Sequence, residues 1–144
     1  MKDAPAQPPS FRLHPQLAAD TEAVAELPLS TVRLMNDSRF PWLILVPRRP
    51  EIRELHELSE RDRAVLVEEV ALASRVLARA TGADKINVGA LGNMVPQLHV
   101  HAVARFRNDE AWPGPVWGTG ERRPYPAAEL ARTCASFAEA LRSA

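Results

Sequence analysis

The chain has 144 residues, of which 46% are hydrophobic, so it can form one well-packed domain but is too short for two ordinary ones. Its 18 basic and 18 acidic residues balance, which leaves no net field to attract a nucleic-acid polymer or an anionic membrane. No apolar run approaches the roughly 20 residues of a spanning helix, and the N-terminus lacks the apolar region of a signal peptide. We expect a soluble, cytoplasmic protein that acts on a small molecule.

The N-terminal quarter predicts a leader followed by strands. Residues 1–10 include three prolines and few apolar residues, so we expect a flexible leader there and a single domain over residues 11–144. Residues 24–34 are compatible with two short strands, or with one strand interrupted at Pro28, because proline cannot donate to a strand ladder.

A hairpin and a long helix are predicted next. Turn-forming residues at 36–39 precede a continuous apolar run, Trp42–Val46, which predicts a strand ending at Pro47. Ser59 then provides an N-cap, and apolar residues recur at helical spacing over residues 60–80 until Gly82 ends the helix.

The C-terminal half predicts a second hairpin, an irregular segment and a helix. Strands over residues 85–90 and 97–106 flank a turn at 89–92 and should pair antiparallel. Four prolines and three glycines make regular structure improbable over residues 108–126, where Trp112 and Trp117 must bury against the domain, a partner subunit or a ligand. The final helix has one apolar stripe, formed by Leu130, Cys134, Phe137 and Leu141.

The most informative segment is the predicted strand over residues 97–106. Its alternation places Gln97, His99 and His101 on one face, while the apolar residues between them face the core. Two neighbouring imidazoles are compatible with an exposed polar face, with a metal site, or with catalysis. The metal site is short of ligands, because the chain has only two other histidines, His14 and His56, and a single cysteine, Cys134.

Nucleophilic catalysis on a phosphate suits these residues. Imidazole has an ordinary pKa of about 6.5, so neutral histidine is available near pH 7 to attack phosphorus. The turn upstream, residues 89–93, could supply backbone N–H groups and the Asn93 amide to the developing charge. Four arginines could pair with phosphate oxygens, although surface arginines are a common alternative: Arg48, Arg49, Arg105 and Arg107.

These residues resemble a known family. The string Asn-Val-Gly-Ala-Leu-Gly-Asn-Met-Val-Pro-Gln-Leu-His-Val-His-Ala-Val-Ala-Arg, residues 87–105, is similar to the signature of the histidine triad (HIT) nucleotide hydrolases and transferases, His-φ-His-φ-His-φ-φ. The resemblance covers about residues 29–106. It implies an α+β fold in which an antiparallel sheet of about five strands carries a long central helix, here with a C-terminal helix. It also implies a homodimer that binds a purine nucleotide and cleaves at its α-phosphate without a cofactor.

The resemblance also implies roles for single residues. His99 falls where the family's central histidine attacks phosphorus, and His101 where the third histidine binds phosphate or the leaving group. Asn93 matches a phosphate contact, Asn36 lies near a nucleoside contact, and Asn87 matches an asparagine that holds the site together.

Two departures from the family pattern concern the site. Gln97 stands where the family has its first histidine, and Phe40-Pro41-Trp42 replaces the usual Pro-Gly-His. Glutamine keeps a donor and an acceptor but cannot titrate, so it can orient the nucleophile but cannot ionise. Trp42 could shape a base pocket or pack in the core. The leading hypothesis is a nucleotide hydrolase or nucleotidyl transferase, and the alternatives are a nucleotide sensor with weak turnover and a metal-dependent protein.

Overall fold

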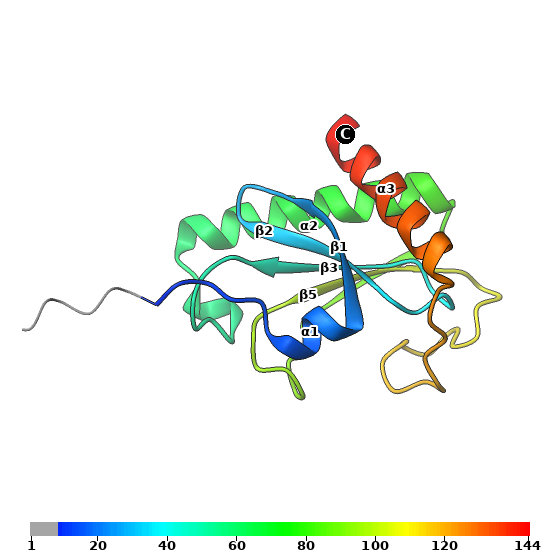
Figure 1. The fold of residues 1–144 in the computed structure, drawn as a ribbon, viewed down its shortest axis with the longest axis horizontal. Coiled ribbons are helices and arrows are strands. Elements are labelled where there is room, and N and C mark those ends of the chain that lie inside the picture. Colours follow the sequence, from blue (N-terminus) through cyan, green and yellow to red (C-terminus); the bar gives the residue numbers. More distant parts are fainter. Residues whose placement is uncertain (1–8) are drawn as a thin grey trace, which may run out of the picture.

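The computed structural model describes residues 9–144 (Figure 1), so the leader expected over residues 1–10 lies almost entirely outside the described residues. The elements in chain order are α1 (Pro15–Asp20), β1 (Thr21–Glu26), β2 (Ser30–Met35), β3 (Trp42–Pro47), the 3-10 turn η1 (Leu55–Glu57), α2 (Glu60–Thr81), β4 (Lys85–Gly89), β5 (Val100–Arg105) and α3 (Ala127–Ser143). Among these residues, no helix is long and apolar enough to cross a membrane.

The strands form one antiparallel sheet in the order β1-β2-β3-β5-β4. The predicted α+β fold, with five strands, a long helix and a C-terminal helix, is confirmed. Residues 24–34 form two strands rather than one, and β1 begins at Thr21, three residues before the predicted start. Pro28 lies in the turn between them, where its missing N–H costs no ladder bond.

Helix α2 has the ends that the sequence predicts. The Ser59 hydroxyl accepts a hydrogen bond from the Asp62 N–H, and Gly82 ends the helix with a φ of 67°. Midway along α2, the buried carboxylate of Glu69 accepts hydrogen bonds from the N–H groups of Leu29 and Ser30. The helix is therefore tied to the β1–β2 turn as well as packed on the sheet.

The two faces of the sheet bury different layers. Figure 1 shows α2 on one side of the sheet and α1 on the other. The core beneath α2 and α3 is built from alternate strand residues and from one stripe of each helix, among them Val32, Leu43, Leu45, Ala73, Leu77, Ala102, Cys134 and Phe137. The opposite face is covered by α1 and by the segment over residues 108–126, with a core that includes Leu17, Phe40, Trp42, Ile44, Val103 and Val116.

The irregular segment is held by buried polar contacts. Arg105 is 1% exposed, and its guanidinium donates to the Asp109 carboxylate, to Asn87 Oδ1 and to the Gly114 carbonyl. The Tyr125 N–H donates to Asn36 Oδ1 at 2.9 Å, which fixes the approach to α3. The prediction of irregular structure over residues 108–126 is confirmed. Hydrogen bonds that involve side chains, and not strand pairing, hold this segment in place.

Candidate active site

The two histidines lie side by side where β5 begins. Strand β5 starts at Val100, so Gln97, Leu98 and His99 precede the strand that the sequence placed over residues 97–106. The alternation nevertheless holds, because Leu98 and Val100 join an apolar cluster that includes Leu66 of α2. The centroids of the His99 and His101 rings are 4.9 Å apart. The exposed-face alternative is wrong, since the two residues are only 7% and 5% exposed.

A backbone carbonyl orients His99. The Nδ1 atom of His99 lies 2.6 Å from the Gln97 carbonyl oxygen, two residues earlier in the chain. Because a carbonyl oxygen can only accept, Nδ1 must carry the proton in this contact. The Nε2 atom of a neutral His99 therefore keeps its lone pair, which is the form that a nucleophile needs.

His101 Nδ1 meets a hydrogen-bond donor, whereas His99 Nδ1 meets an acceptor. The indole N–H of Trp42 donates to His101 Nδ1 at 2.9 Å, so the proton of a neutral His101 lies on Nε2. Burial, followed by the positive charge that His99 can carry, lowers the pKa of His101 from its ordinary 6.5 to about 3. His101 is therefore neutral near pH 7.

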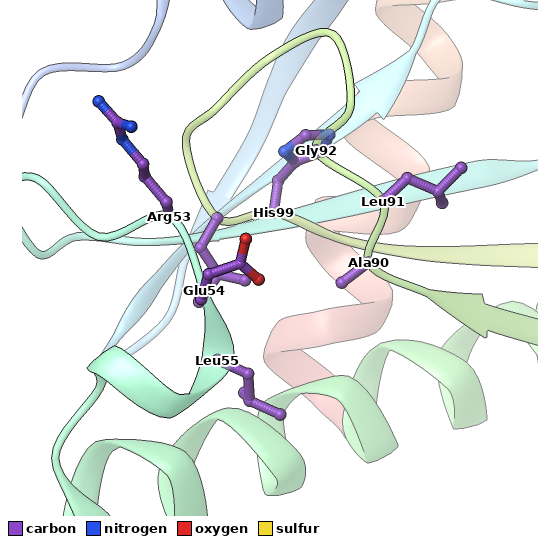
Figure 2. Close-up of a pocket in the computed structure, with 8 residues that line it drawn as sticks. Arg53, Glu54, Leu55, Ala90, Leu91, Gly92 and His99 are labelled. Carbon is purple, nitrogen blue, oxygen red and sulfur yellow. The ribbon is translucent and has the colours of Figure 1, made fainter.

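A cleft of about 220 Å³ opens at His99. Figure 2 shows His99 with Arg53, Glu54 and Leu55 on one side and the loop Ala90–Gly92 on the other. Arg53 and Glu54 precede η1 and Leu55 begins it, whereas the loop follows β4. Two segments far apart in the sequence therefore meet at His99. Sequence reasoning missed Arg53 and Glu54, because they occur in an ordinary polar connection that carries no motif.

The Gln97 side chain is bonded to the N-terminal segment, residues 9–14. Its Oε1 accepts from the His14 N–H and its Nε2 donates to the Arg12 carbonyl, both at 2.8 Å. Gln97 also borders a second cleft, of about 480 Å³, together with His14 and Arg53. Arg53 thus lies between the two clefts.

The other predicted site residues have different surroundings. Asn93 is exposed and lies on the loop beside the His99 cleft, without lining it. Asn36, Asn87 and Arg105 are engaged in the internal contacts given above. Among the arginines, Arg48 pairs with Glu26 and Arg49 with Asp62. The structure therefore brings His99 and His101 together with the Gln97 carbonyl, turns the Gln97 side chain toward the N-terminal segment, and uses Asn36, Asn87 and Arg105 to hold the surrounding fold.

The two tryptophans of the irregular segment bury against the domain. Trp117 lies with its ring centroid 5.4 Å from His101 and 6.4 Å from Trp42. Trp112 packs against the buried guanidinium of Arg105 at 5.7 Å. Over residues 9–144, no group of three or more histidine, cysteine, aspartate or glutamate side chains is arranged to hold a metal ion. The His14 Nδ1 instead accepts from the Gln16 N–H at the start of α1.

The fold and the site together define a class of protein: a five-stranded antiparallel sheet with a long helix on one face and a buried imidazole pair at the start of an inner strand. A family model described as the HIT domain matches residues 16–108. The chain therefore belongs to the HIT, or histidine triad, family.

Solved structures agree with this assignment. A histidine triad protein from Sinorhizobium meliloti is 50% identical, with a TM-score of 0.87, and the match covers 90% of this chain and 96% of that one. One from Marinobacter aquaeolei is 45% identical, with a TM-score of 0.90 and coverage of 94% and 98%. One from Bradyrhizobium japonicum is also 45% identical, with a TM-score of 0.86 and the same coverage. A search of curated proteins found no match.

Proposed function

We propose that this protein is a nucleotide hydrolase or nucleotidyl transferase that acts at an α-phosphate through a nucleotidyl intermediate on His99. The observation that carries the proposal is the 2.6 Å contact between His99 Nδ1 and the Gln97 carbonyl oxygen, which leaves Nε2 as the free lone pair beside a cleft. The substrate is a dinucleoside polyphosphate or a nucleoside phosphoramidate, and no cofactor takes part.

The reaction proceeds in two displacements. His99 Nε2 bonds to the α-phosphorus, the bond to the leaving group breaks with its electron pair, and water later cleaves the N–P bond. His99 carries positive charge while it is bonded to phosphorus, and a neutral His101 does not repel that charge. The Nε2–H of His101 donates to a phosphate oxygen or to the leaving atom. Asn93 and the loop after β4 add donors to the phosphate.

A glutamine at position 97 is compatible with this mechanism. The nucleophile is oriented by the backbone carbonyl of Gln97, not by its side chain. The Gln97 side chain is hydrogen-bonded to the backbone of Arg12 and His14, and these bonds help to fix the Gln97 backbone that orients His99. Ionisation at position 97 is therefore not required, and this favours an enzyme over the weakly active sensor.

We also propose that the protein acts as a homodimer through the β4 edge. Strand β4 is the last strand of the sheet, so one side of it has no strand partner. Beside it lies an apolar groove of about 370 Å³, bordered by Val67, Val88 and Leu55, which are each about half exposed or more. A second copy of this edge would cover the apolar side chains and the unpaired strand. We place the activity in the cytoplasm, because the lone buried Cys134 suits a reducing compartment.

The proposal is tested with diadenosine tetraphosphate and an adenosine phosphoramidate, by measuring AMP release chromatographically. His99→Ala is compared with His56→Ala, a matched change at an exposed histidine outside the site. We expect turnover in the parent and in His56→Ala, and a loss of about 1,000-fold or more in His99→Ala. Calorimetric titration with AMP, together with a melting curve, shows whether each variant still folds and binds.

Other outcomes separate the alternatives. AMP binding without turnover by the parent would indicate the sensor. Activity that chelator removes, with stoichiometric zinc, manganese or iron in the purified protein, would indicate the metal-dependent alternative. Equal turnover by His99→Ala and the parent would contradict nucleophilic catalysis by His99.

A further inference from the structure

We propose that Trp42 is a positioning residue, whose indole N–H holds the proton of His101 on Nε2 so that His101 meets the substrate as a hydrogen-bond donor. This inference rests on the proposed function for its catalytic consequence. The tautomer it assigns is a property of the free protein and can be measured without a substrate.

The geometry comes from the pairing of β3 with β5. Trp42 is the first residue of β3 and lies opposite Val103 of β5, so its ring reaches His101 two residues earlier on the same face. The indole Nε1 and His101 Nδ1 are 2.9 Å apart, and the ring centroids are 5.6 Å apart at 55°. Both residues are 5% exposed, so water does not compete readily for either atom.

The chemistry of the contact permits one assignment. An indole nitrogen only donates, so the atom that it meets must offer a lone pair, and His101 Nδ1 cannot carry a proton while the bond exists. A neutral ring then has its proton on Nε2. Trp117 packs edge-on against His101 at 76° and against Trp42 at 86°, which opposes a ring flip that would exchange the two nitrogens.

The packing role of Trp42 does not account for this bond. Trp42 belongs to the apolar core beneath α1, where Phe40 meets it edge-on at 6.4 Å. A phenylalanine would satisfy that packing without an N–H. If the proton of His101 moved to Nδ1, the indole N–H would be left unpaired in a buried site, and the Nε2 lone pair would face the phosphate oxygens. The hydrogen bond from Trp42 therefore determines that His101 presents an N–H group, and not a lone pair, to an anion.

Two substitutions at the same position separate the donor from the ring. Trp42→Phe keeps an aromatic ring and removes the N–H. Trp42→His places Nε2 at the ring position of the indole Nε1, counted from Cβ. It restores a donor when that nitrogen carries the proton, while losing the larger ring. Trp112→Phe is the matched control, because Trp112 packs against Arg105 rather than against a histidine.

The first readout is the protonation of His101 in the ligand-free protein. Long-range ¹H–¹⁵N NMR spectra distinguish the two tautomers, and His101→Gln assigns the signals. We expect a proton on Nε2 in the parent, in Trp112→Phe and in Trp42→His, and a mixture of tautomers in Trp42→Phe. A parent with its proton on Nδ1, or a Trp42→Phe variant with the tautomer of the parent, would overturn the proposal.

The second readout is turnover. We expect kcat to fall roughly 10- to 100-fold in Trp42→Phe with a smaller change in KM, and to recover in Trp42→His, because the loss is one of orientation rather than of substrate binding. A kcat in Trp42→Phe equal to that of the parent would reject the positioning role. If the parent turns over no nucleotide, the proposed function fails while the tautomer measurement still decides this inference. If Trp42→Phe does not fold, the spectrum of the parent decides it, because a proton on His101 Nδ1 would overturn the proposal.

Discussion

His99 and His101 hold their protons on different nitrogens because each meets a partner of opposite kind. A carbonyl oxygen faces Nδ1 of His99, and an indole N–H faces Nδ1 of His101. The same ring position therefore carries a proton in one residue and a lone pair in the other. At Nε2 the polarities are reversed, so a lone pair on His99 lies next to an N–H donor on His101.

The contacts of Gln97 predict that its side chain stabilises the fold more than it supports catalysis. Gln97→Ala removes two hydrogen bonds to the N-terminal segment, so we expect the free energy of unfolding to fall by about 1–2 kcal/mol in urea titrations. The carbonyl that orients His99 remains, so kcat should fall less than tenfold. A loss as deep as that of His99→Ala would instead mean that the amide itself acts on the substrate.

The buried His101 predicts a pH-dependent stability. Its folded pKa of about 3 lies below the ordinary value near 6.5, so below pH 6.5 the unfolded chain binds a proton that the folded protein does not. The free energy of unfolding should therefore fall by about 1.4 kcal/mol per pH unit from this group as the pH decreases toward 3. Above pH 6.5 its contribution is constant.

Denaturation of the parent and of His101→Gln between pH 6.5 and 4.5 measures this slope. The parent should lose about 2 kcal/mol more than the variant over that range, because the unfolded histidine is already half protonated at pH 6.5. Equal slopes would show that His101 takes up a proton in the folded protein. Asp109, whose pKa is lowered to about 2, titrates below this window.

At the scale of elements, β5 links the histidine pair to the irregular segment. His101 lies near one end of the strand, and Arg105 lies at the other end on the same face. Arg105 joins β4 through Asn87 and the irregular segment through Asp109. Since Trp117 of that segment packs on His101, the ion pair at one end of β5 helps to place an aromatic ring at the other.

The Arg105–Asp109 pair predicts a large effect of a single substitution. Burial alone would raise the pKa of Asp109, but hydrogen bonds from Arg105 and from three backbone N–H groups lower it to about 2. Asp109→Ala leaves the Arg105 guanidinium buried without its carboxylate, so we expect a loss of about 3–5 kcal/mol in the free energy of unfolding.

An exposed pair provides the control for this measurement. Glu139 and Arg142 form an ion pair on the surface of α3, with both side chains about two-thirds exposed. We expect urea unfolding of Glu139→Ala to match that of the parent, because solvent already screens this pair. If Asp109→Ala also left the free energy of unfolding unchanged, Arg105 would have to find another hydrogen-bond acceptor or reach water.

At the scale of the whole molecule, one side of β4 pairs with β5 and the other side has no strand partner. The sheet is packed on both faces, so its remaining unsatisfied backbone groups lie at the edges. The apolar groove beside β4 shares Leu55 and Ala90 with the His99 cleft. A subunit docked there would lie next to the site without needing to enter it.

The proposed dimer predicts the effect of one charge at this edge. Val88→Lys places an ammonium group on the half-exposed residue of β4, so we expect a dimeric parent and a monomeric variant by chromatography with light scattering. Ala23→Lys, on the exposed surface of the opposite edge strand β1, should leave the dimer intact. A parent that elutes only at its chain mass of 15.9 kDa would rule out the dimer.

Most elements follow from local patterns in the sequence. The caps at Ser59 and Gly82, the continuous apolar run of β3 and the apolar alternation in β5 depend on neighbours a few residues away, and they are confirmed. The start of β1 was wrong by three residues, because Thr21 and Glu22 pair with β2 despite their polar side chains.

The sequence by itself determined the antiparallel hairpins and the pairing of His99 with His101, because these depend on periodicity over short distances. The fold class followed from the resemblance of residues 29–106 to the HIT family. The tertiary structure decided how each histidine holds its proton and what the polar residues around it do. Trp42 meets His101 across 59 residues, and Gln97 meets Arg12 across 85. Such contacts depend on which strands become neighbours, and no local pattern in the chain encodes the polarity of the atom that a ring nitrogen will meet.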